Sequence, residues 1–156
     1  MNVLCLPARD EADEIVARML AQLLEARGFC AHAPSASALA SEMVEMIDGQ
    51  KADVVCISAM PPATVAHARY LCKLIEARYP DLHLLVGLWT LKSDRDRARA
   101  RISHTGNVRV FTTLHDAQQE IEQIVQPLVF NRTPREAPAA KDQHADATPA
   151  ALPHMA

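Results

Sequence analysis

The chain has 156 residues, of which 49% are hydrophobic and 22% charged, and its formal net charge at pH 7 is -3. This composition excludes an intrinsically disordered chain, and the length suits one hydrophobic core. Because the phosphate backbone of nucleic acids rewards a clearly basic face, a net negative chain is not expected to have a nucleic-acid partner.

The apolar runs and the cysteines bear on the expected cellular location of the chain. No apolar run reaches the about 20 residues that span a membrane, and no signal peptide is recognisable. Four cysteines, at positions 5, 30, 56 and 72, show no zinc-ligand spacing. We therefore expect free thiols, no bound metal and a cytoplasmic location.

Short apolar runs predict β-strands that are buried on both faces. The expected strands are residues 1–6, 29–33, 53–58, 82–87 and 108–111.

Amphipathic segments between these runs predict α-helices. In the first, residues 10–27, apolar positions recur every three or four residues, acids occupy the first turn and Gly28 follows as the stop. Ser37 is the expected cap of the second helix, and Pro61-Pro62 are expected to start the third. These and the closing helix are expected at 37–47, 61–79 and around 121–128.

The alternation of strands and helices predicts an α/β fold of the doubly wound type. Parallel strands joined by right-handed crossovers give an open five-stranded sheet with helices on both sides, a three-layer, flavodoxin-like and Rossmann-like arrangement. The expected strand order is 2-1-3-4-5. This domain should span residues 1–130, whereas the Ala- and Pro-rich segment 131–156 predicts a disordered tail.

Ligands of such sheets bind beyond the carboxyl ends of the strands, where the strand order reverses. The loops 7–13, 58–62 and 87–91 should meet there, and their mixture is too apolar for a plain solvated rim. We expect a small-molecule ligand or a protein partner at this edge. The candidate ligand-binding residues are Arg9, Asp10, Asp13, Ser58, Met60, Gly87 and Trp89.

Other functions of this topology lack their residues. A phosphoryl-accepting receiver needs an Asp at the end of the third strand and a Lys at the end of the fifth, where this chain has Ser58 and Phe111. A phosphate-binding first loop is rich in glycine, whereas residues 7–13 are acidic and contain none. Because no nucleophile or acid/base group converges in these loops, we expect no enzyme activity.

At the same loops the sequence resembles the cobalamin-binding domain family over about residues 2–128. The family motif acid-any-His-any-any-Gly falls on residues 11–16, where Glu11 keeps the acid, Asp13 replaces the cobalt-ligating His and Val16 replaces the Gly. Two further motifs are reduced to Ser58-Ala59-Met60 and Val86-Gly87-Leu88. The resemblance implies the family's fold with weak or no cobalamin binding, so no cofactor is expected. The alternative is a cobalamin-binding module without a protein imidazole.

Residues 3–14 and 56–62 are also similar to the soluble C-terminal regions of bacterial permeases of the autoinducer-two exporter family. This similarity implies a regulatory or ligand-sensing domain that is tethered at the inner membrane in a longer protein. It supplies no activity.

Several residues have a structural interpretation beside the functional one. Trp89 either stacks on a flat ligand or partner or covers the core, and the core is favoured. Arg9 and Asp10 either hold a polar ligand or form a surface ion pair, which is favoured. Ser58 either donates to a ligand or caps the helix at Pro61. Asp13 could ligate a hard metal, but the solvated start of a helix is favoured.

The charged segment after Trp89 also has two interpretations. It is either a solvated helix face, which is favoured, or a contact with anionic lipid headgroups or an acidic partner. Its charged residues are Lys92, Asp94, Arg95, Asp96, Arg97, Arg99 and Arg101.

Overall fold

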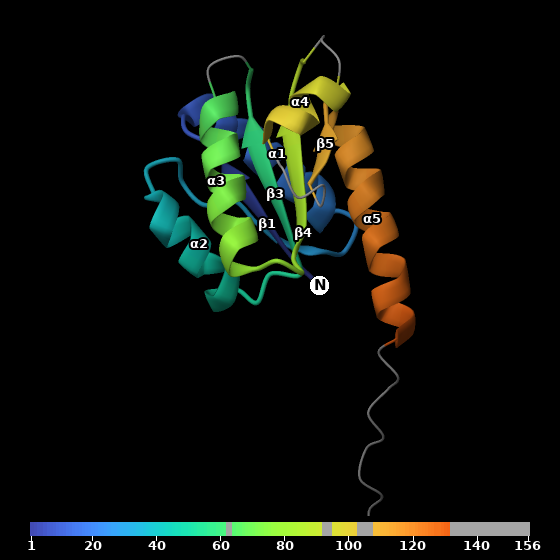
Figure 1. Cartoon of the computed structure of the whole chain (residues 1–156). Helices are drawn as coiled ribbons and strands as arrows, with labels where there is room; N and C mark the ends of the chain where they lie inside the picture. The colour runs from blue at the N-terminus through green and yellow to red at the C-terminus, as the bar shows by residue number, and fades with distance from the viewer. Residues whose placement is uncertain (62–63, 92–94, 103–107, 132–156) are drawn as a thin grey trace, which may run out of the picture.

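The computed structural model describes residues 1–61, 64–91, 95–102 and 108–131. Five of the described segments form one parallel sheet in the order β2-β1-β3-β4-β5, as predicted (Figure 1). The strand order reverses between β1 and β3, so the switch point lies where these two strands end. The strands are β1 (Asn2–Pro7), β2 (Cys30–His32), β3 (Val54–Ala59), β4 (His83–Leu88) and β5 (Arg109–Phe111).

Helices cover both faces of the sheet and complete the three layers. Side chains of α2, α3 and α4 pack on one face, and those of α1 and α5 pack on the other. In Figure 1, α2 and α3 lie in front of the sheet and α1 lies behind it. The helices are α1 (Glu11–Glu25), α2 (Ala40–Gly49), α3 (Val65–Arg78), α4 (Arg95–Ile102) and α5 (Leu114–Asn131).

The central strands are buried on both faces because successive side chains point to opposite layers. In β1, Leu4 and Leu6 pack with α2 and α3, whereas Val3 and Cys5 pack with α1 and α5. All four side chains are at most 2% exposed. This double burial explains why β1 is a continuous apolar run in the sequence.

The first helix begins and ends as the sequence predicts. The Asp10 carboxylate accepts a hydrogen bond from the Asp13 backbone N–H at 3.1 Å, and the Asp13 carboxylate accepts one from the Asp10 N–H at 3.4 Å. This reciprocal pair is a capping box. After the helix, Gly28 has a φ of 85°, a conformation that glycine adopts without a Cβ clash.

Two predicted helix starts are wrong. Ser37 does not cap α2, because its hydroxyl donates to Ser35 Oγ at 3.1 Å, and the helix begins three residues later. There the Leu39 N–H donates to the Glu42 carboxylate at 2.7 Å. The third helix begins at Val65 and not at Pro61, and Pro62 lies outside the described residues.

The charged segment after Trp89 and the predicted tail are described only in part. Of the charged segment, Arg97, Arg99 and Arg101 are exposed on α4, whereas Lys92 and Asp94 lie outside the described residues. The predicted tail also lies outside them beyond residue 131. Within the described part of the chain, no helix is long and apolar enough to cross a membrane.

Candidate functional site at the switch point of the sheet

The loops after β1, β3 and β4 meet at the carboxyl edge of the sheet, as predicted. Hydrogen bonds of the β type continue beyond the strand ends: the Ala8 N–H donates to the Ser58 carbonyl at 2.8 Å, and the Trp89 N–H donates to the Ala59 carbonyl at 3.1 Å. Each loop therefore leaves the sheet from a fixed position, and their side chains share a small space.

Asp13 is the central carboxylate of this edge. Its residue is 0% exposed, although it lies in the first turn of α1. One carboxylate oxygen accepts from the Met60 N–H at 2.7 Å. The other accepts from the N–H groups of Arg9 at 3.0 Å and Asp10 at 3.4 Å. Asp13 thus ties the loop after β1 to the loop after β3, 47 residues away in sequence.

Two opposing effects act on this carboxyl group. Burial raises the pKa of Asp13 above the usual value of an aspartate, and the backbone N–H donors of Met60, Asp10 and Arg9 lower it again. The nearby charge of Asp10 adds to the increase, and the net direction is upward. The favoured interpretation of Asp13 as the solvated start of a helix is wrong, because the residue is buried. Both oxygens are engaged with the protein's own backbone, so Asp13 is a structural link and not an open ligand for a metal.

Ser58 and Trp89 form a second link between the loops. The Trp89 indole N–H donates to the Ser58 hydroxyl at 2.7 Å, and Trp89 and Ser58 are 3% and 0% exposed. The interpretation of Trp89 as a core residue therefore matches the structure. The alternative role of Ser58 as a helix cap is wrong, because Thr64 precedes α3 and donates to the Met60 carbonyl at 2.9 Å.

The lack of a side chain at Gly87 allows the Trp89 indole to pack closely against β4. A Cβ atom built on Gly87 would overlap the six-membered part of the Trp89 ring. The ring therefore packs against the bare backbone of β4, two residues before its own position. Trp89 fills the space above β4 that a ligand would need if it approached the sheet there.

Arg9 and Asp10 are both exposed. The predicted ion pair between their side chains is not formed in the described structure, where Asp10 instead caps α1. Met60 contributes its backbone N–H and carbonyl to the site, and its side chain is partly buried against the core. The predicted site residues therefore lie together as expected. Most of their contacts are hydrogen bonds and packing within this group.

The thiols offer no nucleophile near this edge. Burial raises the pKa of Cys56 and of Cys72 to about 12, and it also raises the pKa of Cys5. All three thiols stay protonated at neutral pH. Among the described residues, no group of three or more His, Cys, Asp and Glu side chains could hold a metal ion.

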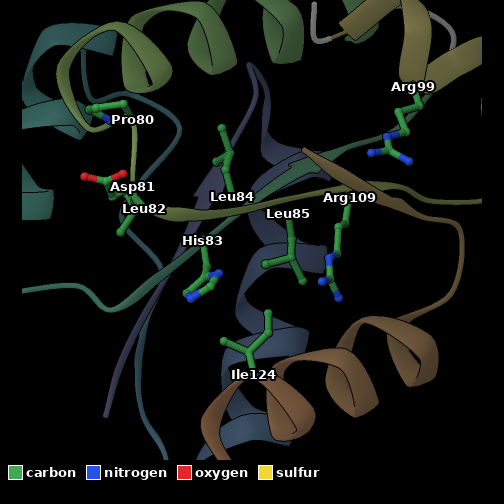
Figure 2. Close-up of a pocket in the computed structure, with 9 residues that line it drawn as sticks. All are labelled: Pro80, Asp81, Leu82, His83, Leu84, Leu85, Arg99, Arg109 and Ile124. Carbon is green, nitrogen blue, oxygen red and sulfur yellow. The ribbon is translucent and has the colours of Figure 1, made fainter. Parts of the chain in front are cut away.

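A separate pocket of about 440 Å³ lies at the amino end of β4 (Figure 2). In the described part of the chain β5 pairs with Leu85, Val86 and Gly87, and the pocket lies beside the two residues of β4 that precede them. Arg99 from α4 and Arg109 from β5 line it together with Ile124 from α5. The Arg109 guanidinium is ion-paired with Glu120. Sequence reasoning missed this pocket, because it depends on how α4, β5 and α5 pack around the start of β4 and not on the residue pattern of one element.

Comparison with known proteins gives a likeness of structure only. By sequence, no family and no curated protein matches this chain. Among solved structures, a cobalamin-binding protein from Desulfitobacterium hafniense DCB-2 matches with a TM-score of 0.63 and 12% identity over 78% of this chain and 57% of that one. The fold of this chain is therefore similar to that of part of this cobalamin-binding protein. This chain thus matches little more than half the length of that protein.

A flavodoxin from Pseudomonas aeruginosa, in a mutant form with one cysteine replaced by alanine, also matches. The identity is 16% and the TM-score 0.47, over 83% of this chain and 97% of that one.

Proposed function

We propose that this chain is a non-catalytic regulatory or ligand-sensing domain that uses a degenerate cobalamin-binding fold and binds no corrinoid. The observation that carries the proposal is the state of Asp13. It stands where the resemblance places the cobalt-ligating His, and both of its oxygens accept backbone hydrogen bonds from Arg9, Asp10 and Met60. A carboxylate held in this way cannot take over the role of the imidazole.

The packing above β4 supports the same proposal. Trp89 covers Gly87, the residue that remains of the family's Gly-Gly pair. Val16, which replaces the Gly of the first motif, is partly buried against the α1 side of the core. A bulky cofactor would have to displace the indole and break its hydrogen bond to Ser58. The described residues therefore do not fit cobalamin.

The absence of an activated nucleophile supports a non-catalytic role. Ser58 is buried and its hydroxyl accepts the indole N–H. The buried thiols remain protonated at neutral pH because their pKa values are raised. Activated cysteines have a lowered pKa and activated serines donate to an adjacent base, whereas these thiol pKa values are raised and the Ser58 hydroxyl is engaged by the indole.

Corrinoid binding is the direct test. The full chain mixed with hydroxocobalamin should elute apart from it on gel filtration, and the absorption spectrum of the corrinoid should not shift. A Trp89→Ala variant, which opens the space above Gly87, serves as the matched comparison. Stoichiometric co-elution with the wild-type chain would overturn the proposal and establish the alternative, a cobalamin-binding module without a protein imidazole.

A second part of the proposal is the setting of the domain. The similarity of residues 3–14 and 56–62 to permease C-terminal regions favours a domain tethered to a membrane transporter. An antibody against the domain should then detect the native polypeptide in the membrane fraction, at a mass well above 17.1 kDa. Recovery of the native polypeptide only from the soluble fraction would contradict this setting and leave the corrinoid result unaffected.

A further inference from the structure

The outer face of α1 carries a stripe of large apolar side chains that the rest of the described chain leaves uncovered. Ile15, Met19 and Leu23 follow one another at four-residue intervals and are 54%, 48% and 41% exposed. Residues spaced in this way lie along one side of a helix. We call these three residues the α1 stripe. Contiguous exposed apolar surface marks a site of interaction.

One flank of the α1 stripe carries a cation, Arg18, and further along an acid, Glu25, and the first turn before them carries Glu11 and Glu14. Arg18 and Glu25 are both exposed, and they are seven residues apart. That spacing is about two helical turns, so the two side chains lie on the same flank of α1, about 10 Å apart along its axis. Gln22 lies between them on this flank and is also exposed.

This arrangement is complementary to itself when one copy is turned around. We propose that the α1 stripe binds the α1 stripe of a second copy of this chain, with the two helices antiparallel and a two-fold axis beside Gln22. Arg18 of each copy then meets Glu25 of the other. A parallel two-fold pairing would instead put these flanks of the two copies on opposite sides of the contact, so Arg18 of one copy could not meet Glu25 of the other.

The antiparallel register also matches the apolar residues. The Arg18–Glu25 contact puts the axis between residues 21 and 22, so the two Gln22 side chains lie close to it, and Met19 of one copy lies about one residue rise from the level of Leu23 of the other. Ile15 then lies about 3 Å beyond Ala26, a small and exposed residue at the end of the partner helix. Symmetric pairs of this kind are the commonest oligomers, because one patch serves both copies.

The pairing is expected to be weak and to depend on concentration. One helix on each side offers less than the about 800 Å² per partner of a standard interface. Arg18 already forms an ion pair with Glu14 of its own helix and is 61% exposed, so its contact with Glu25 sets the register more than the affinity.

Association should be measured first with single apolar substitutions. The mass of the full chain, determined by sedimentation velocity over a wide range of concentration, should rise from that of a monomer toward twice that value. Met19→Lys should hold it at the monomer throughout. Tyr70→Lys is the matched control, because Tyr70 is 55% exposed and belongs to α3 on the opposite face of the sheet. A monomeric wild type, or loss of association in Tyr70→Lys alone, would overturn the proposal.

Charge reversal tests the pairing itself. Arg18→Glu and Glu25→Arg should each weaken association about tenfold, because each replaces two attractive contacts with two repulsive ones. The double variant should recover most of the loss. Equal weakening in all three variants, with melting temperatures unchanged, would show that the two residues do not meet.

Cysteine cross-linking tests the register. The background carries Cys30→Ser, because Cys30 is exposed, whereas the other thiols are buried. Gln22→Cys should form a disulfide-linked dimer on mild oxidation, and a mixture of Met19→Cys and Leu23→Cys should form a mixed one. Ala12→Cys should not, because its two copies would lie about 30 Å apart along the helices. Efficient cross-linking of Ala12→Cys would reject the antiparallel register.

Discussion

Trp89 contributes to stability through both its buried ring and its hydrogen bond to Ser58. We expect Trp89→Ala to lower the free energy of unfolding by about 3–5 kcal/mol, as truncations of large buried aromatic residues do. Trp89→Phe keeps an aromatic ring but leaves Ser58 without its donor, and it should cost about 1–3 kcal/mol. Urea denaturation, followed by circular dichroism, measures both. A change below about 1 kcal/mol for Trp89→Ala would mean that the ring is not part of the core.

Gly87 is required by the same contact. Gly87→Ala would drive a methyl group into the indole, and we expect a loss of about 1–3 kcal/mol from overpacking. Gly49 is the matched control, because a Cβ there has no neighbour within 4 Å. Gly49→Ala should be neutral, or should stabilise by about 0.4–1 kcal/mol through a smaller unfolded-state entropy.

A double-mutant cycle attributes the Gly87 effect to the ring. In a Trp89→Leu background, Gly87→Ala should cost much less than in the wild type, because the obstructing atoms are gone. Equal costs in both backgrounds would place the strain elsewhere in β4.

The first turn of α1 connects this helix to two neighbouring segments. Asp13 holds the loop after β3 through Met60. The next residue, Glu14, accepts hydrogen bonds from the Ala36 N–H at 2.7 Å and the Ser35 hydroxyl at 3.2 Å, and so it holds the loop before α2. Adjacent carboxylates thus fix two segments that lie far apart in the sequence.

These two carboxylates should respond to pH in opposite directions. Burial raises the pKa of Asp13, so its contribution to stability is complete below the ordinary aspartate pKa of about 4 and is lost as the pH rises through the raised value. The hydrogen bond from the Ala36 N–H lowers the pKa of Glu14. Its contribution is complete above the ordinary glutamate pKa and is lost as the pH falls through the lowered value.

Denaturation at a series of pH values checks both signs. The stability of the wild type relative to Asp13→Asn should fall as the pH rises through the raised pKa of Asp13. The stability of the wild type relative to Glu14→Gln should fall as the pH drops below about 4. Parallel pH dependences for the two variants would show that one of the two directions is wrong.

Elements were more predictable than the contacts between them. The spacing of apolar residues and Gly28 located α1, because these signals are local. The contact from Asp13 to Met60 spans 47 residues, and the return of Trp89 over Gly87 depends on the path of the chain after β4. Neither follows from residue type or spacing. Ser37 shows that even a local cap can be misassigned when a nearby partner, Ser35, competes for its hydroxyl.

For the whole molecule, the strand order could be predicted because five buried runs alternate with helices, and because parallel neighbours need right-handed crossovers. The extents of both edge strands were predicted to within one residue at each end, but the pocket beside the start of β4 was not predicted. It lies at the amino end of β4, between residues of α4, β5 and α5 that are far apart in the sequence (Figure 2).

The switch-point edge of the sheet and the outer helices differ in what they expose. The switch-point edge is held together by the links from Asp13 and Trp89. The α1 stripe lies on one face, and Tyr70 and Leu39 are exposed on the other. This distribution favours partners that bind the outer helices over ligands that enter the sheet edge.

The single tryptophan of the sequence gives this protein an optical signal of its own. Because Trp89 is 3% exposed and lies at the switch point, its emission should be blue-shifted in the folded chain and quenched only slowly by acrylamide. A ligand that entered between the loops would have to move the indole toward water, and the emission maximum would then shift to longer wavelength. A partner that docked on α1 would leave the spectrum unchanged. One fluorescence titration, without any label, therefore distinguishes opening of the sheet edge from binding at the outer helices.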